Sequence, residues 1–311
     1  MGLQLPRRTA GKPVTIRRAA ALAAVGISVL VLGGCSSETK GEWERFAMPD
    51  PASQQGERTL DLWQGAWIAA LITGVIVWGL IFYAIWRFRR RSDDEIPVQT
   101  RYNLPLEIFY TIAPVIMVVV FFAHTVKTQN YVLDEDRDPP VNTIEVVGQQ
   151  WSWTFNYGIG EMDRSADEDL FDERFPYSSY VHDSGTGSQI PDLYLPVGVT
   201  TRFNLHSPDV IHDFGVPGFL MKMDVVPGRV NHYVIKPTRT GDFRGKCYEL
   251  CGVYHSRMLF NVHVVSQADY DAHVQQLADA GATSDLPLLG GDFASTQTGL
   301  ESGDESEEGA E

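Results

Sequence analysis

Positively charged residues are scarce in the second part of this 311-residue sequence. From Lys127 onward there are 12 Lys and Arg against 30 Asp and Glu, and no Lys or Arg follows Arg257. This part therefore carries about 18 net negative charges, whereas the part before it is slightly basic. Such a field repels nucleic acid and anionic lipid and attracts a basic partner. Nucleic-acid binding is thereby excluded, although the same charge also serves to keep a domain soluble.

Charged residues are absent from Leu62 to Trp86, a segment long enough to span a bilayer. Aromatic residues gather near its two ends, as they do at membrane interfaces, and an arginine cluster, residues 87 to 91, follows it. A second apolar stretch, Ile108 to Val126, contains Pro114, which membrane helices tolerate. Because such clusters face the cytoplasm, we expect a two-helix transmembrane hairpin over residues 60–126, in the plasma membrane, with the C-terminal domain on the extracytoplasmic side.

Cysteine is rare, and the first of three cysteines ends an N-terminal export signal. Five basic residues precede a short apolar run, Ala19 to Leu32, which is too short for a comfortable membrane span. Leu32-Gly-Gly-Cys35 resembles a lipobox. We therefore predict a lipoprotein-type signal peptide over residues 1–34, lipidation of Cys35, and an extracytoplasmic segment over residues 35–59. The alternative is a third membrane span with an ordinary cysteine.

Beyond the membrane segments, short strand-like runs replace the helical pattern. These runs cover residues 141–147, 193–199, 201–205, 230–235 and 259–265, punctuated by Pro and Gly. They indicate a β-sandwich over residues 127–281, with Ser266 as the N-cap of a short helix, Gln267 to Ala280. An acidic insertion over residues 161–189 interrupts it as a surface loop or partner contact. Low hydrophobicity and one-sided charge predict a disordered acidic tail over residues 282–311.

The other two cysteines lie in the segment Cys247-Tyr-Glu-Leu-Cys251-Gly-Val-Tyr-His255-Ser-Arg-Met258. Thiolate, imidazole and thioether together suit copper, and two cysteines, where a mononuclear blue site needs one, indicate sulfurs shared between two metal ions. Taken alone, the cysteine pair equally fits a disulfide or zinc. Neither alternative explains Met258, because a thioether does not bind structural zinc. His212 remains either a ligand or an ordinary surface or core histidine.

The sequence resembles subunit II of the haem-copper oxidases, the cytochrome c oxidase subunit that carries the dinuclear copper centre CuA. The resemblance is nearly full-length. It rests on the two membrane helices, Gln150-Trp-Ser-Trp153, His206-Ser-Pro-Asp-Val-Ile-His212, Lys222-Met-Asp-Val-Val-Pro-Gly-Arg229 and the cysteine segment, in family order.

The resemblance implies a Greek-key cupredoxin fold with copper at one end. His212 and Met258 would bind one copper, and His255 and the backbone carbonyl of Glu249 the other, with the two cysteines bridging both ions. The Glu249 carboxylate would reach a magnesium or manganese ion shared with subunit I. Without the family, Glu249 is one more surface carboxylate.

Further roles follow from the same resemblance. Trp151 would accept the electron from cytochrome c, with Asp209 and Asp224 in the docking surface. By strand alternation, however, Trp151 and Trp153 share one face, so that spacing cannot separate an exposed from a core tryptophan. Glu107 would stand at the entrance of a proton pathway; without the family it is an interfacial carboxylate.

The implied activity belongs to a complex. Cytochrome c would reduce CuA, which would pass electrons to haem a of subunit I, where haem a3 and CuB reduce oxygen to water with proton pumping. This chain alone holds no oxygen-reducing centre. The implied partners are subunits I and III, membrane lipid, and a cytochrome c that is soluble, membrane-bound, or part of a supercomplex with a quinol-cytochrome c reductase.

Four other classes of protein fit less well. Quinol oxidase subunit II has lost the copper ligands that are present here. A thioredoxin-fold copper chaperone needs an alternating βαβ pattern around its cysteines, which this sequence lacks. Nitrous-oxide reductase needs a large soluble catalytic domain for which there is no room. A structural lipoprotein would leave the ligand set unexplained.

Overall fold

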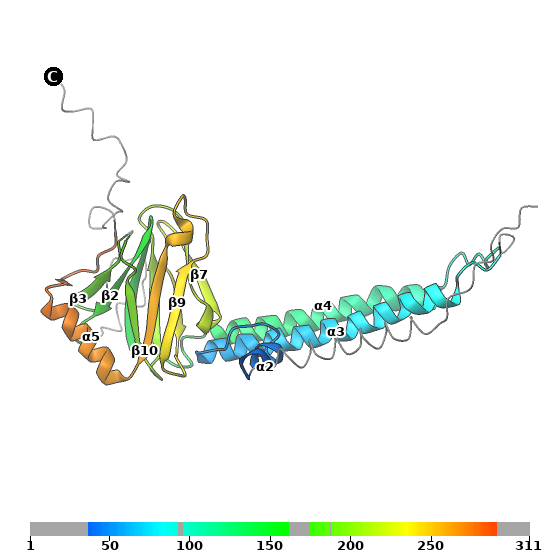
Figure 1. Ribbon diagram of the computed structural model, residues 1–311, viewed down its shortest axis with the longest axis horizontal. Coiled ribbons are helices and arrows are strands. Elements are labelled where there is room, and N and C mark those ends of the chain that lie inside the picture. The colour runs from blue at the N-terminus through cyan, green and yellow to red at the C-terminus, as the bar shows by residue number, and fades with distance from the viewer. Residues whose placement is uncertain (1–36, 93–95, 162–174, 187, 291–311) are drawn as a thin grey trace, which may run out of the picture. The chain divides into compact units, whose positions relative to one another are not determined.

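The computed structural model describes residues 37–92, 96–161, 175–186 and 188–290 (Figure 1). The predicted signal peptide, Cys35, and most of the predicted tail lie outside these residues. The chain divides into two compact units, Met1–Met48 and Pro49–Glu311. The first contains helix α2 (Ser37–Glu44), within the segment expected to be extracytoplasmic.

Two long helices begin the second unit and confirm the predicted hairpin. Helix α3 (Gln54–Arg87) and helix α4 (Leu104–Val132) are long and apolar enough to cross a membrane and lie side by side (Figure 1). Helix α3 begins before residue 60 because Ser53 caps it, its side chain accepting a hydrogen bond from the Gly56 N–H at 2.9 Å. Pro114 lies inside α4 without ending it.

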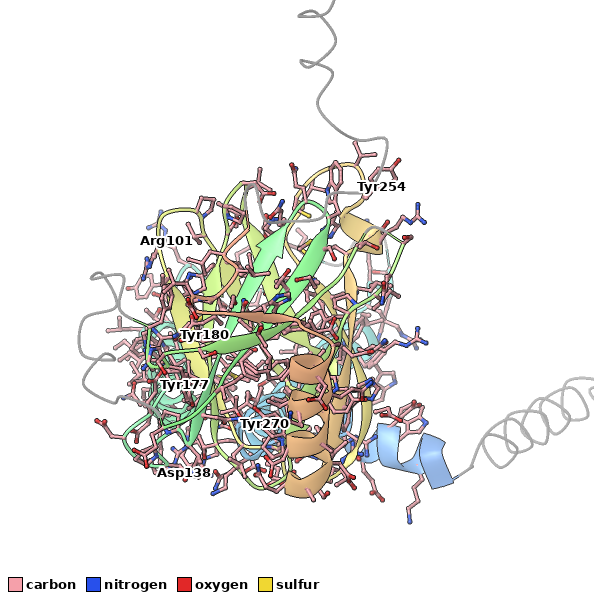
Figure 2. All side chains as sticks on the ribbon, turned by 90° about the vertical axis from the view of Figure 1, so that its left-hand side faces the viewer. Arg101, Asp138, Tyr177, Tyr180, Tyr254 and Tyr270 are labelled. Carbon is pink, nitrogen blue, oxygen red and sulfur yellow. The ribbon has the colours of Figure 1, made fainter. Side chains whose placement is uncertain are left out.

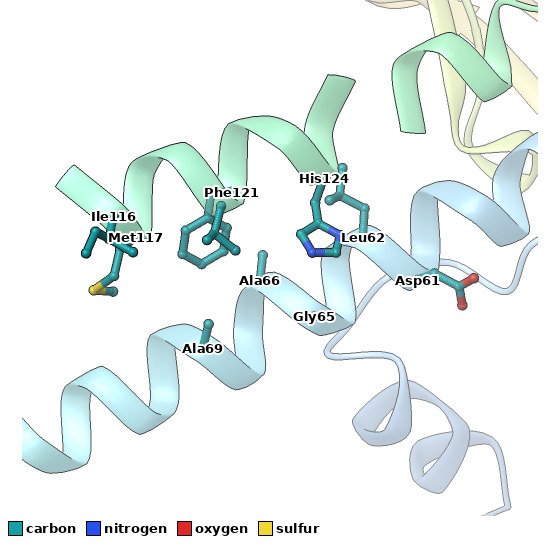
Figure 3. A pocket seen from close by; sticks show the side chains of 10 residues that line it. Asp61, Leu62, Gly65, Ala66, Ala69, Ile116, Met117, Phe121 and His124 are labelled. Atoms are coloured by element: carbon teal, nitrogen blue, oxygen red, sulfur yellow. The ribbon is translucent and has the colours of Figure 1, made fainter. Parts of the chain in front are cut away.

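A cavity of about 390 Å³ lies between the two helices. Most of its lining is apolar, and Asp61 of α3 and His124 of α4 stand near one end of it (Figure 3). Both residues belong to the half of the hairpin that leads into the β domain.

Eleven strands in the described residues form a two-layered sandwich (Figure 1). One sheet has the order β11-β3-β2-β1-β5-β8, and the other has the order β4-β10-β9-β6-β7. The strands are β1 (Asn142–Gln149), β2 (Ser152–Gly158), β3 (Tyr180–Ser184), β4 (Asp192–Pro196), β5 (Thr201–His206), β6 (His212–Val216), β7 (Met221–Val225), β8 (Asn231–Ile235), β9 (Gly241–Cys247), β10 (Leu259–Val265) and β11 (Thr283–Ser284). The pairs β1–β5 and β4–β10 are parallel, and the other pairs are antiparallel. The predicted all-β domain after a helical hairpin is confirmed.

Aromatic side chains fill the space between the sheets. Phe214 of β6 and Phe260 of β10 stack with ring centroids 4.8 Å apart, and Trp153 of β2 packs edge-on against both. All three are fully buried or nearly so. Complete burial of a large apolar side chain contributes about 1.5–3 kcal/mol. The strands that carry the cysteine segment are thereby fixed to a rigid core.

Helix α5 (Gln267–Asp279) follows the last long strand and packs beside β3 and β4 (Figure 1). Its N-cap is Ser266, whose hydroxyl accepts a hydrogen bond from the Asp269 N–H at 3.2 Å. The predicted helix and its cap are confirmed.

The predicted insertion and tail need correction at their ends. Residues 180–184, expected within the acidic insertion, form β3 and pair with β2. Residues 283–284, expected in the tail, pair with β3 as β11, and Pro287 is buried. A few backbone hydrogen bonds and the buried ring of Pro287 suffice to hold this segment to the sheet. The composition of a long stretch does not reveal such short pairings.

Candidate metal centre

Three connections meet at one end of the sandwich, which we call the metal pole. They are the β1–β2 turn (residues 150–151), the segment before β6 (residues 207–211) and the β9–β10 connection (residues 248–258). In Figure 2, Tyr254 of the third connection lies at one end of the β domain and Asp138 at the other. Strands from both sheets therefore position the loops of the metal pole.

The metal-binding atoms expected from His212 and from the cysteine segment, Cys247 to Met258, converge at the metal pole. The two Sγ atoms lie 3.8 Å apart, and both thiols are free. Nearby donors lie at 3.9 Å (His212 Nδ1 to Cys247 Sγ), 3.6 Å (His255 Nδ1 to Cys251 Sγ), 3.8 Å (Met258 Sδ to Cys251 Sγ) and 3.1 Å (Glu249 carbonyl oxygen to Cys247 Sγ). The donor set is two thiols, two imidazoles, a thioether and a carbonyl.

These separations fit metal ligands. Two donors bound to one ion at roughly 2.0 to 2.3 Å in tetrahedral geometry lie about 3.3 to 3.8 Å apart. The distances from each sulfur to its neighbouring imidazole, and between the sulfurs, fall close to this range. A disulfide would instead bring the sulfurs to about 2.05 Å. Because thioether and thiolate sulfur favour copper over hard cations, the donor chemistry fits copper.

His212 is oriented by a carboxylate. It begins β6, is fully buried, and its Nε2 lies 2.8 Å from Asp209 Oδ1, which leaves Nδ1 directed at Cys247. Such a carboxylate fixes the ring and raises the basicity of a metal-binding histidine. Burial works against ionisation of Asp209, but hydrogen bonds from His212, Gln150 and Val210 outweigh it and lower the pKa of Asp209.

The two thiols differ in acidity. Burial raises the pKa of Cys247, but hydrogen bonds from His212 and from the Asp213 backbone outweigh this effect, and the pKa falls to about 7. Burial and the neighbouring Cys247 raise the pKa of Cys251 to about 12. The first proton of the pair therefore leaves readily and the second does not. A bound metal ion supplies the positive charge that allows both sulfurs to be thiolates.

Trp151 contacts the metal loop directly. It lies in the β1–β2 turn rather than in a strand, is half-buried, and donates its indole N–H to the Cys251 carbonyl at 3.2 Å. Trp153 is a fully buried core residue. The expectation that both share one face of a strand was wrong, because the turn begins after Gln149 and breaks the alternation.

The remaining predicted residues lie apart from the donor cluster. Asp224 of β7 is exposed, as is the Glu249 side chain, whose backbone carbonyl alone contacts a cysteine. Glu107 lies in the first turn of α4, where its Oε1 accepts a hydrogen bond from the Asn103 N–H at 2.9 Å. Their predicted roles in partner docking, cation binding and proton delivery need no contact between these side chains and the sulfur cluster, and these roles stay predictions.

Sequence reasoning gave no role to two residues beside the donors. Gln150 donates its side-chain N–H to the Cys251 carbonyl at 2.7 Å, so that this carbonyl accepts two hydrogen bonds from the β1–β2 turn. Asp213 is buried next to His212, and its Oδ2 accepts from Lys222 Nζ at 2.6 Å. Burial raises the pKa of Asp213 despite this ion pair. Only its position directly after His212 could have singled out Asp213.

Comparison with known proteins agrees with this architecture. The periplasmic domain of cytochrome c oxidase subunit II matches residues 142–265, and the transmembrane domain of the same subunit matches residues 41–126. The chain belongs to the cytochrome c oxidase subunit II family. The resemblance stated from the sequence motifs is confirmed.

Members of the cytochrome c oxidase subunit II family are similar to this chain over most of its length. A probable cytochrome c oxidase subunit 2 of Streptomyces avermitilis is 46% identical over 278 residues, 83% of this chain and 87% of the relative. A probable subunit 2 of Streptomyces coelicolor is 43% identical over 300 residues, 90% of this chain and 92% of the relative. The solved periplasmic domain of subunit II of cytochrome oxidase from Bradyrhizobium japonicum is 27% identical, with a TM-score of 0.35, over 45% of this chain and 94% of that one.

Proposed function

We propose that this chain is the electron-accepting subunit of a cytochrome c oxidase and that its metal pole holds dinuclear copper. The observation that carries the proposal is the convergence of six donors, five of them sulfur or imidazole, from the start of β6 and from the segment Cys247 to Met258, with both thiols free. When bound, such a centre supplies one-electron transfer between cytochrome c and haem a of subunit I, which leads to oxygen reduction and proton pumping elsewhere in the complex.

The protein residues hold the donors in a fixed arrangement. His212 and Met258 would serve one copper ion, His255 and the Glu249 carbonyl the other, with Cys247 and Cys251 bridging. Strand β9 ends at Cys247, while β6 begins at His212, and the two strands pair directly. A ligand frame held by paired strands moves little when the charge on the metal changes, which favours rapid electron transfer.

Trp151 is the proposed point at which the electron enters the protein. Its indole is half-buried, so that one part can meet cytochrome c while the N–H contacts the Cys251 carbonyl. Asp209 and Asp224 would take part in docking a basic cytochrome. Because Asp209 is also tied to His212, its main contribution is to hold that ring.

Other proposed roles concern the membrane and the partner subunits. The Glu249 carboxylate is exposed and free to bind magnesium or manganese together with subunit I. Glu107 would help deliver protons from the cytoplasm. The arginines that follow α3 support an orientation with the β domain on the extracytoplasmic side of the plasma membrane. Lipidation of Cys35 would add a second anchor, and mass spectrometry of the mature N-terminus tests it.

Metal analysis of the purified full-length chain tests the central proposal. We expect two copper ions per chain and a paramagnetic resonance spectrum in which one electron is shared by two equivalent coppers. Cys247→Ser and Cys251→Ser should each abolish this spectrum. Cys35→Ser is the matched control and should retain it. A well-folded chain with a Cys247–Cys251 disulfide and no copper would rule the proposal out.

A further inference from the structure

One face of the transmembrane hairpin continues past the cavity between α3 and α4 towards the β domain. Side chains that recur every three or four residues lie on one side of a helix. The residues of α3 on this face are Arg58, Leu62, Gly65, Ala66 and Ala69. Those of α4 are Met117, Val120, Phe121, His124 and Tyr131. All of these except Arg58 and Tyr131 line the cavity, and those two residues follow it at the end that leads into the β domain.

The cavity itself suits a hydrocarbon chain. Its volume of about 390 Å³ falls within the range of about 300–1,000 Å³ that is usual for small-molecule sites. Small residues on α3 leave the space, and Met117 and Phe121 of α4 face it from the other helix (Figure 3). Its polar lining residues, Asp61 and His124, stand together near one end. An occupant therefore needs an apolar part, with polar atoms at one end only.

Two arginines mark that polar end. The guanidinium carbon of Arg58 lies 4.9 Å from the centroid of the Tyr131 ring, and that of Arg137 lies 3.5 Å from the same centroid. Arg137 Nη1 also donates to the Tyr131 carbonyl at 2.6 Å. An aromatic face attracts a cation without neutralising it, and each guanidinium has five N–H donors. Both arginines are therefore positioned by Tyr131 and can still bind an anion.

These arginines stand at the level where a bilayer has its phosphate groups. The segment without charged residues begins at Leu62, one helical turn after Arg58, and Trp63 and Trp67 mark the membrane–water interface there. The Arg58 side chain is 40% exposed, and Arg137 is exposed. Arginine binds phosphate through paired, charge-assisted hydrogen bonds. A phosphate at this end and a hydrocarbon chain in the cavity together describe a phospholipid.

Nearby carboxylates indicate which kind of headgroup fits. Asp61 lies 3.7 Å from Arg58, an exposed contact that leaves Arg58 available to a phosphate. Asp134 accepts a hydrogen bond from the Arg137 backbone N–H at 3.2 Å, and Asp136 is exposed next to Arg137 in the sequence. These carboxylates repel a headgroup that carries negative charge alone and attract an ammonium group. A headgroup that combines one phosphate with one amine matches both signs of charge.

We propose that the hairpin binds one phosphatidylethanolamine molecule at the end that leads into the β domain. One acyl chain lies in the cavity between α3 and α4, the phosphate lies between Arg58 and Arg137, and the ammonium group lies near Asp134. The bound lipid stabilises the hairpin by filling space that the side chains of the two helices leave open. This site does not involve the metal pole, and only its assignment to the outer leaflet rests on the membrane orientation proposed above.

The experiment titrates the full-length chain, purified in detergent and freed of lipid, with phosphatidylethanolamine. Native mass spectrometry counts the lipid molecules bound to each chain and gives the dissociation constant. Phosphatidylglycerol is titrated in the same way to compare headgroups. The assembled oxidase is then measured with phosphatidylethanolamine, because partner subunits also contact the membrane helices.

One pair of variants tests the phosphate contact. Arg58→Gln combined with Arg137→Gln should weaken binding of phosphatidylethanolamine at least about tenfold, the usual loss for a hydrogen bond to a charged group. Arg89→Gln combined with Arg90→Gln, beyond the other end of α3, is the matched control and should bind like the unaltered chain. Phosphatidylglycerol should bind the unaltered chain less tightly than phosphatidylethanolamine does.

A second pair of variants tests the acyl-chain contact. Ala69→Phe places a ring in the cavity and should abolish binding of one lipid molecule, whereas Ala70→Phe, at the exposed neighbouring position, should not. Ala69→Leu is a smaller replacement that should weaken binding and serves if Ala69→Phe does not fold. Circular dichroism measures the helix content of each variant.

Several results would overturn the proposal. Unchanged binding in the Ala69 variants would place the lipid outside the cavity, and unchanged binding in the double arginine variant would show that the phosphate is held elsewhere. Tighter binding of phosphatidylglycerol than of phosphatidylethanolamine would contradict the headgroup assignment. Loss of the lipid in the assembled oxidase would mean that a partner subunit covers the site. The copper content of the metal pole is measured separately, so that each of these results leaves the proposed function intact.

Discussion

At the scale of single residues, the site depends on contacts that hold the donors more than on the donors alone. His212 has its Nε2 committed to Asp209, and the Cys251 carbonyl accepts hydrogen bonds from Gln150 and Trp151. The residue types that could bind copper were predictable because cysteine is rare in this sequence. The hydrogen bonds that hold these donors in place could not be predicted, since Gln150 and Asp209 are brought next to the metal loop only by the fold.

Asp209→Asn should weaken copper binding roughly 10- to 100-fold, the usual effect of removing the carboxylate behind a metal-binding histidine. The substitution keeps the size of the side chain but removes the charge that favours one orientation of His212. Competition with a copper chelator measures the affinity. Asp242→Asn is a matched control, because Asp242 Oδ1 lies 2.7 Å from His263 Nδ1 on the surface, apart from the donors. Unchanged copper affinity in Asp209→Asn would show that the His212 ring is held by packing alone.

Trp151→Phe should slow reduction by cytochrome c by orders of magnitude, because it removes the indole N–H that contacts the Cys251 carbonyl. Copper absorption should be retained, since no donor is changed. Stopped-flow spectroscopy of the assembled oxidase measures the rate, with Trp43→Phe as a control at an exposed tryptophan outside the β domain. Normal kinetics in Trp151→Phe would place the electron path elsewhere.

Alkylation of the metal-free chain should distinguish the two site cysteines. The pKa of Cys247, lowered to about 7, predicts that its reaction with iodoacetamide rises as pH increases through about 7, because the thiolate is the reactive form. Cys251 should stay slow over the same range, since its pKa is raised to about 12. By linkage, the Cys247 contribution to the free energy of unfolding is full above pH 9.0 and is lost as pH falls through about 7. Peptide mass spectrometry measures each site, and equal reactivity of both thiols would contradict the assignment.

At the scale of elements, prediction succeeded where hydrophobic patterning is simple. Strands β5, β8 and β10 lie where β-branched and aromatic runs placed them. Strands β6 and β9 were missed for different reasons. All five residues of β6 are buried, so that it shows no alternation. Strand β9 carries charged residues at positions 242, 244 and 246 on its exposed face and glycines at positions 241 and 245 on the opposite face, so that it lacks a row of apolar side chains. Only pairing between distant segments reveals such strands.

Gly245→Ala should destabilise the β domain by about 1–3 kcal/mol, the usual cost of overpacking a core. A Cβ at Gly245 would lie 1.9 Å from Phe260 Cζ, so that the ring of Phe260 would have to move within the sandwich. Urea denaturation of the metal-free chain, followed by tryptophan fluorescence, measures the change. Gly74→Ala is the control, because open space surrounds that position in α3. An unchanged unfolding midpoint in Gly245→Ala would show that the core around Phe260 is loosely packed.

At the scale of the whole molecule, one chain joins a helical hairpin to a β domain, so that the residues proposed for proton delivery and for electron transfer belong to a single polypeptide. The family and this division could be predicted from the sequence, because membrane helices and strands have distinct patterns of hydrophobicity. The exact ends of the segments could not. Ser53 starts α3 early, and Pro287 and Leu288 attach part of the predicted tail to the sheet.

Glu107→Gln in the assembled oxidase should slow proton uptake and turnover while leaving reduction of the metal centre by cytochrome c unchanged. Glutamine can still accept the hydrogen bond from Asn103, but it cannot carry a proton to the partner subunit. Proton uptake followed with a pH indicator dye provides the measurement. Glu57→Gln, in the first turn of α3, is the matched control. Wild-type proton uptake in Glu107→Gln would remove this residue from the pathway.

The paired hydrogen bonds on the Cys251 carbonyl make the β1–β2 turn part of the ligand loop. A docked protein that displaces the indole of Trp151 would remove one hydrogen bond from the Cys251 carbonyl. Loss of this hydrogen bond would change the redox potential of the proposed copper centre. Thermodynamic reciprocity requires the reverse as well: the oxidised and reduced forms would bind that protein with unequal strength. Dissociation of the oxidised cytochrome could thus be driven by the electron that it has delivered.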